Sequence, residues 1–390
     1  MRTLSWCHAD FFFMRRPGTR GTYAQTGVLN QRTDRSRTQT HRVLPISSLR
    51  FVLAVWVVLG HYGLPFLESP QRTRFLWSLR AFRNLAFEGS AAVIVFFVIS
   101  GFCIHFPHRK TLKLSSWRAF YLRRYVRILI PMAVAIGLSI PLGMKFGLFT
   151  QSILWSLLCE EIYYLLYPLV LRLRGRLGWP IVMSIGWVIS LATILTNPSA
   201  RYYPSYGPYL NWAVGWPCWL LGCWLAERQE NDQFLPVSTL QIWGWRSAAY
   251  LLSLVTGALS FHTPLGLPWT LNAFAVFATF WLEQEMRYYR MKARTPWFES
   301  PGEASYSIYL THTHGPVLLS TLVVADKVTP GTYWFEAIIL CFVFSVTFYW
   351  LVERPCHALA RRVAKSVERF GSIAAAHPPS PRSPRLRKPL

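Results

Sequence analysis

The sequence predicts an all-α protein, a polytopic bundle of about ten membrane-spanning helices. Of its 390 residues, 52% are hydrophobic and 16% aromatic, while only 15% are charged. A soluble domain usually carries about 25% charged residues. Apolar runs near the roughly 20 residues that a helix needs to cross a bilayer recur along the chain, and the charges lie between them.

The apolar runs give the expected spans in order. They lie near residues 46–64, 89–107, 128–148, 152–171, 179–196, 209–226, 242–260, 267–284, 305–325 and 333–352. Together they form one expected transmembrane domain over residues 46–355. Residues 1–45 are polar and arginine-rich and contain no apolar stretch long enough for a cleaved signal peptide, so we expect a disordered cytoplasmic arm. Residues 356–390 are expected to be a basic cytoplasmic tail, largely disordered.

Basic residues predict the orientation. They concentrate before the first span and after the second, fourth, eighth and tenth spans. Simple alternation puts all these segments on one side, which the positive-inside rule identifies as the cytoplasm, so both termini are expected inside. The loop at 65–88 disagrees, because it should lie outside but carries Arg72, Arg74, Arg80 and Arg83. We interpret it as an interfacial or substrate-facing helix.

The net charge and the cysteines exclude other classes. A net charge of +24 suits a nucleic-acid-binding protein. Here the basic residues lie at the borders of apolar spans, where they set topology and contact anionic lipid, and no nucleic-acid-binding motif is present. The seven cysteines form no CxxC pair and fall mostly in apolar runs. They predict neither a metal site nor a disulfide framework.

The first span, SSLRFVLAVWVVLGHY over 47–62, places an arginine near its start and a histidine near its end. On an α-helix the eleven steps from Arg50 to His61 make almost three turns, so both side chains share one face, about 16 Å apart along the axis. Ionisable groups inside an apolar span are usually functional. The alternative is a snorkelling Arg50 and a hydrogen-bonded interfacial His61.

The second and third spans supply two further patterns. Ser100 and Gly101 interrupt the apolar run FFVISGF, which favours close helix packing. Arg124 and Arg127 are three residues apart and therefore share a helical face at the membrane entrance. Convergent guanidinium groups bind phosphates well, although topology charge and lipid contact would also explain them.

The fourth span, LWSLLCEEIYYLLYP, contains two acidic residues well inside an apolar run. A carboxylate there is costly and needs a partner. For Glu160 or Glu161 the candidate partners are Arg50 and His61 on another helix.

The last two spans also carry polar residues. In SYSIYLTHTH, His312 and His314 add polar lining at the membrane edge. The tenth span ends in VERP, where Glu353 and Arg354 are expected to form an interfacial ion pair or a helix end.

These six motifs follow the order typical of the acyltransferase-3 family, and the sequence resembles that family over about residues 45–360. The resemblance implies a multi-spanning O-acyltransferase of the bacterial inner membrane. It implies a cytoplasmic acyl-CoA donor, usually acetyl-CoA, and a hydroxyl acceptor outside on a carbohydrate, glycolipid or related molecule, as in polysaccharide O-acetylation. Thr311 and Thr313 depart from the family pattern, because aromatic residues often surround the ninth-span histidine.

The resemblance marks Arg50, His61, Arg124, Arg127 and Glu160 as the important positions. We assign catalysis to His61, Glu160 and Arg50. The expected acyl-CoA-binding residues are Arg123, Arg124, Arg127, Ser100 and Gly101, and the expected substrate-binding residues are Trp155, Ser156, Tyr306 and His312.

Acyl transfer from a thioester to a hydroxyl needs a base, a stabilised oxyanion and a hold on both substrates. His61 is the candidate base because histidine titrates near neutral pH, or it is itself acylated as a relay across the bilayer. Glu160 would orient His61 or pair with Arg50, and Arg124 and Arg127 would hold the CoA phosphates.

Two other classes compete with this interpretation. In a transporter or flippase of a polar or lipid-linked molecule, the buried charges would line a substrate path. A non-catalytic membrane scaffold would tolerate loss of His61.

Overall fold

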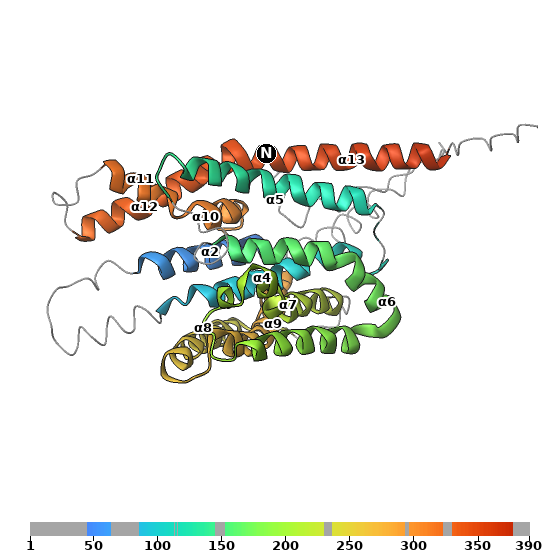
Figure 1. Ribbon diagram of the computed structural model, residues 1–390, viewed down its shortest axis with the longest axis horizontal. Coiled ribbons are helices and arrows are strands. Elements are labelled where there is room, and N and C mark those ends of the chain that lie inside the picture. Colours follow the sequence, from blue (N-terminus) through green and yellow to red (C-terminus); the bar gives the residue numbers. More distant parts are fainter. Residues whose placement is uncertain are drawn as a thin grey trace, which may run out of the picture.

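A computed structural model describes residues 45–63, 86–112, 114, 116–144, 153–229, 236–292, 296–322 and 330–376. Within these ranges the protein is helical and contains no strand. The long helices run roughly along the longest axis of the molecule (Figure 1). The expected arm at 1–44, most of the loop at 65–88 and the final residues 377–390 lie outside the described residues.

The described helices follow one another in a simple order. They are α2 (Ile46–Tyr62), α4 (Gly89–His105), η3 (Phe106–His108), α5 (Trp117–Ser139), α6 (Leu154–Thr196), η4 (Tyr203–Tyr206), α7 (Gly207–Arg228), α8 (Thr239–His262), α9 (Leu267–Lys292), η5 (Pro301–Ala304), α10 (Ser305–Thr311), α11 (His314–Leu322), α12 (Pro330–Phe348), η7 (Tyr349–Glu353) and α13 (Arg354–Ala376). Every expected span overlaps one or more of them.

Length and hydropathy identify some of these helices as membrane-spanning by themselves. In the part of the chain that the structure describes, three segments are long and apolar enough: Gly89–His108, Leu154–Thr196 and Gly331–Glu368. Helix α2 is apolar but shorter. The molecule is therefore a helical membrane protein.

Two expected spans differ from their helices. The third helix, α5, starts at Trp117, about three turns before the apolar run, because the Ser116 hydroxyl accepts from the Ala119 amide at 3.2 Å and caps it. The ninth span is broken, since α10 ends at Thr311 and α11 begins at His314.

Helix α6 contains the fourth and fifth expected spans joined at a sharp kink. Gly178 has a φ of 79°, a conformation that glycine adopts without steric cost. The two arms, 154–177 and 179–196, fold back on each other through this residue (Figure 1).

Helix α4 lies in the middle of the core and packs against α2, α7 and α9. It is apolar all round, as expected for a fully surrounded helix. A Cβ added at Gly101 would lie 2.0 Å from the Trp219 carbonyl oxygen, and one at Gly222 would lie 1.9 Å from that of Val98. These two glycines therefore let the backbones of α4 and α7 touch.

Helices α12 and α13 are joined by the π-helical turn η7 and continue in nearly one line (Figure 1). Helix α13 packs on α5, and its buried positions Cys356, Ala360 and Ala364 are small and share one face. The chain from residue 356, which the sequence predicted to be largely disordered, is thus helical as far as Ala376.

The two ends of the bundle differ in charge. The end at which α4, α7 and α9 finish carries Arg109, Arg174, Arg228 and Arg290, and we call it the basic end. It lies to the right in Figure 1. The opposite end holds the C-terminus of α2 with His61.

Candidate active site

A cavity lies between α2, α4, α5, α6 and α10. Its polar lining comes from Arg50, Ser100, Arg124, Ser156, Glu160, Tyr164, Ser305, Tyr306 and Tyr309. The apolar part of the wall includes Phe96 and Phe97. Its free volume is about 60 Å³, which is room for a few water molecules but not for a nucleotide.

The cavity is long in the direction of α4. It is lined from Val93 to Ile104, eleven steps that correspond to about 16 Å of helix. Ile104 is next to the last residue of α4, at the basic end. The lining therefore extends from near the basic end over about half the thickness of a bilayer core.

Arg50 is positioned by an acidic cap on α2. The Glu299 carboxylate accepts from the amides of Ser47 (3.2 Å) and Ser48 (2.9 Å), which satisfies two free N–H groups of the first turn. Gly302 lies against the Ser47 carbonyl, where a Cβ would come within 2.1 Å. This contact fixes α10 beside the start of α2, so Arg50 and Tyr306 face the same cavity.

Hydrogen bonds hold the other lining groups in place. The Tyr164 hydroxyl donates to Glu160 Oε1 and lies 3.0 Å from the Ser100 hydroxyl, which also accepts from Trp219 Nε1 at 3.3 Å. The Ser156 and Tyr309 hydroxyls are 2.6 Å apart. The predicted residues Ser100, Ser156 and Glu160 are thus gathered around one cavity.

The arginines cluster beside this cavity. Arg124 lines it and is 9% exposed. The Arg127 Nε donates to His357 Nε2 on α13 at 3.1 Å. Arg127 also interacts electrostatically with Arg50, Arg124 and Glu353. One buried and two half-buried positive charges therefore lie close together, a costly arrangement that favours a bound anion.

Glu353 is the functional candidate that sequence reasoning missed. It is fully buried and accepts from the Ser307 amide at 3.1 Å and from the Ser307 hydroxyl at 2.5 Å. It also interacts electrostatically with Arg50 and Arg127. The expected interfacial ion pair or helix end is therefore wrong for this residue. The signal was available, because an acidic residue ends a strongly apolar run, as at Glu160.

His61 lies outside the lining of the cavity, against His312. The centroids of the two rings are 4.8 Å apart. His312 is fully buried at the break between α10 and α11, and its Nδ1 lies 2.8 Å from the Tyr309 carbonyl oxygen. Tyr309 lines the cavity, and its ring centroid is 6.4 Å from that of His312. Tyr309 thus connects the cavity with the histidine pair.

Of the two expected partners of Glu160, the cavity brings only Arg50 to it. The remaining assigned residues lie outside the cavity lining and make other contacts. Gly101 contacts α7, Trp155 stacks on Tyr203 with centroids 5.7 Å apart, and Arg123 pairs with Glu368 of α13 at 3.3 Å.

His314, two residues after His312, joins α11 to its neighbours. Its Nε2 lies 2.9 Å from the Ser139 hydroxyl and 3.0 Å from the Ala135 carbonyl oxygen, and its ring stacks on Phe344.

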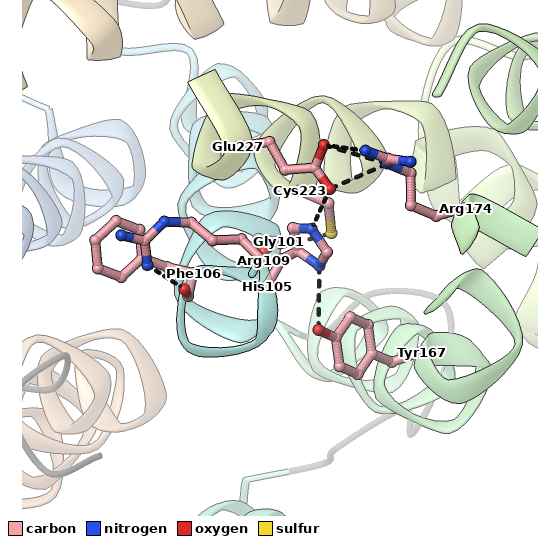
Figure 2. A network of polar contacts seen from close by, with 8 residues as sticks. All are labelled: Gly101, His105, Phe106, Arg109, Tyr167, Arg174, Cys223 and Glu227. Atoms are coloured by element: carbon pink, nitrogen blue, oxygen red, sulfur yellow. Dashed lines mark hydrogen bonds and ion pairs between the residues drawn. The ribbon is translucent and has the colours of Figure 1, made fainter. Parts of the chain in front are cut away.

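A polar network ties α4, α6 and α7 together at the basic end (Figure 2). Arg174 Nε and Nη2 both donate to the Glu227 carboxylate, at 3.1 and 2.8 Å. The fully buried His105 lies between Glu227 and Tyr167, with its Nε2 3.0 Å from Glu227 Oε1 and its Nδ1 3.1 Å from the Tyr167 hydroxyl. Bidentate pairing of this kind holds α4, α6 and α7 together at the basic end.

The acyltransferase-3 family model, described as an acyltransferase domain, matches residues 46–353. No curated protein and no solved structure matched the chain. The family match covers most of the chain, including every residue that lines the cavity and both histidines of the pair. The chain therefore belongs to the acyltransferase-3 family and is a membrane-bound acyltransferase.

Proposed function

We propose that the protein transfers an acyl group, most simply acetyl, from cytoplasmic acyl-CoA to a hydroxyl of a carbohydrate or glycolipid. The observation that carries this proposal is the cavity in which Arg50, Arg124 and Glu160, from three different helices, converge. Charges that line a cavity inside an apolar bundle usually serve a charged substrate or a reaction.

The charges near the basic end suit the donor. Coenzyme A has an anionic nucleotide head and a slender pantetheine arm that ends in the thioester. Arg124 and its neighbour Arg127 would bind the phosphates by charge-assisted hydrogen bonds. The arm would then enter the narrow cavity along α4, while the nucleotide stays outside at the basic end.

The histidine pair suits the acceptor. His61 is exposed near the end of α2 that is opposite the basic end, so it is accessible to a hydroxyl from that side. As general base it would take the hydroxyl proton as the oxygen attacks the thioester carbonyl. The carbon–sulfur bond then breaks, and the thiolate leaves as CoA thiol after taking up that proton.

For the setting of this reaction we propose the bacterial inner membrane, with ten spans and both termini in the cytoplasm. The concentration of arginine at one end of the bundle supports this orientation. With that end inside, the donor meets the cavity from the cytoplasm and the acceptor meets His61 from outside.

The proposed function is tested with purified protein in lipid nanodiscs. Acetyl-CoA labelled with ¹⁴C in the acetyl group is incubated with a panel of methyl glycosides, and both labelled glycoside and free CoA thiol are measured. We expect both products in equal amounts. Movement of a glycoside across vesicles that hold the same protein, with no label transferred, would instead identify a transporter or flippase.

A further inference from the structure

His312 has a hydrogen-bonding state that its surroundings fix. Its ring is fully buried, and its Nδ1 lies 2.8 Å from the Tyr309 carbonyl oxygen. A carbonyl oxygen can only accept, so Nδ1 must carry the proton and donate it. In a neutral imidazole the other nitrogen, Nε2, then carries a lone pair and can only accept.

The Nε2 atom of His312 is buried and has no hydrogen-bond partner among the described residues. A buried acceptor without a donor is costly, so such an atom in a functional protein usually has a role. The ring whose centroid lies 4.8 Å away belongs to His61, which is exposed and can supply an N–H group. Rotation of the His61 ring would let this N–H reach the lone pair, while the His312 ring keeps its bond to Tyr309.

We infer that His312 is a positioning residue, which accepts a hydrogen bond from one ring nitrogen of His61 and so leaves the other nitrogen free to act as base. This inference rests on the proposed function. The hydroxyl proton moves to the free nitrogen of His61 and later to the leaving thiolate, and His312 keeps its own proton on Nδ1 throughout. Its lone pair stabilises the imidazolium that forms transiently on His61, as a buried orienting group does in other base-assisted transfers.

The break between α10 and α11 serves this arrangement. It frees the His312 carbonyl from helical bonding, and the Tyr62 hydroxyl donates to it at 3.3 Å. Because Tyr62 follows His61 directly on α2, this bond holds the histidine pair together through the backbone.

Two substitutions separate positioning from simple packing. Asparagine reproduces the position of Nδ1 but has no atom at that of Nε2, whereas glutamine places a polar atom near Nε2 and has none at Nδ1. We expect His312→Asn to lower kcat by about 10- to 10²-fold with little change in the acetyl-CoA KM, as loss of an orienting partner typically does. His312→Gln should retain more activity than His312→Asn. His314→Gln is the matched control and should keep kcat near wild type, because its Nε2 contacts serve packing.

If wild-type protein transfers acetyl to a methyl glycoside but His312→Asn does so at the wild-type rate, the inference is overturned and the proposed function stands. A ranking in which asparagine exceeds glutamine would also overturn it, since that ranking marks a structural Nδ1 bond. One measurement needs neither variants nor activity. The ¹⁵N spectrum of histidine-labelled protein in nanodiscs should show His312 neutral, with Nδ1 protonated and Nε2 bare, and a protonated Nε2 would contradict the inference.

Discussion

At the residue scale, two groups of ionisable side chains inside this bundle have different surroundings. Arg50, Arg124 and Glu160 line the cavity. His61 and His312 lie together beyond Tyr309. The first group is suited to holding an anionic donor and the second to moving a proton. Substitutions in the first group should therefore raise the KM for acetyl-CoA, whereas substitutions in the second should lower the rate of transfer.

The histidine group is tested first by His61→Ala. We expect transfer to fall by at least about 10²-fold, because a general base typically contributes 10²–10⁴. The exposed side chain contributes little to packing, so protein level and membrane insertion should stay near wild type. The measurement is acetyl transfer to a methyl glycoside per inserted molecule. Activity that survives within about tenfold would exclude His61 as the base.

The donor group is tested by Arg124→Ala. Charge-assisted hydrogen bonds are typically worth about 1.5–3 kcal/mol, so the KM for acetyl-CoA should rise by about 10- to 10²-fold. Lysine should rescue partly, since it keeps the charge but not the bidentate fork. Arg118→Ala is the control, because Arg118 is exposed in the first turn of the same helix. If Arg124→Ala and wild type have the same KM for acetyl-CoA, Arg124 does not bind the donor and serves membrane topology and lipid contact instead.

Glu353 should control stability more than any surface carboxylate. It is fully buried and is the counter-charge near Arg50 and Arg127. Removing one member of a buried charge group typically costs about 3–5 kcal/mol, because the remaining charges are left unpaired. We expect Glu353→Gln to lower the thermal midpoint in detergent markedly. Glu368→Gln, which breaks the half-exposed pair with Arg123, should change stability by less than about 1 kcal/mol, and equal midpoints for the two variants would refute this assignment.

The sequence predicted which residues matter better than it predicted which of them touch. Helical periodicity placed Arg50 and His61 on one face of α2. Arg50 lines the cavity together with Tyr306 of α10, and His61 lies against His312 just after α10. Periodicity could not tell that Glu160 shares the cavity with Arg50 and not with His61, because spacing within one helix says nothing about the order of neighbouring helices. The role of Glu353 was hidden for the same reason, since its contacts come from α5, α10 and α2.

At the element scale, the contact between α4 and α7 holds the cavity wall in shape. Gly101 and Gly222 face each other across it, and each lies directly against backbone of the other helix. Backbone cannot move aside as a flexible side chain can. Any added Cβ must therefore push the two helices apart and displace the wall on which Ser100 lies.

This contact is tested by Gly222→Ala. The added Cβ would come within 1.9 Å of the Val98 carbonyl oxygen, and overpacking of this kind typically costs about 1–3 kcal/mol. We expect a lower thermal midpoint in detergent. Gly244→Ala in α8 is the control, since a Cβ there meets nothing within 4 Å and alanine favours the helix. If both variants have the same thermal midpoint, the close contact between α4 and α7 does not limit the stability of the protein.

Hydropathy predicted that the spans exist and erred at their edges. It counts apolar residues, so it placed the start of α5 near residue 128, although the helix starts at Trp117. Those extra turns are polar on one side and are supported by packing on α13. It also read 305–325 as one span, because the polar break at 312–313 is short. Packing and capping, which decide both features, are absent from a hydropathy profile.

At the scale of the whole molecule, the asymmetry between the two ends predicts how the protein lies in the membrane. Arg109, Arg174, Arg228 and Arg290 lie at the same end of the bundle. Positively charged segments are retained in the cytoplasm during insertion. We therefore expect a fluorescent protein fused after Leu390 to fluoresce and alkaline phosphatase fused there to be inactive. The reverse result would invert the bundle and place the arginine cluster away from cytoplasmic CoA.

The π-helical turn at Tyr349–Glu353 determines which residues of α13 face inward. A π turn contains one residue more than an α turn, and one residue corresponds to about 100° of rotation around the axis. The sequence positions that face the core after this turn are therefore shifted relative to those that face it before the turn. Glu353 and the small residues Cys356, Ala360 and Ala364 point inward in the new phase. The length of this segment is consequently constrained more tightly than its composition, because a change of side chain alters one contact, whereas a gained or lost residue turns the whole C-terminal helix away from α5.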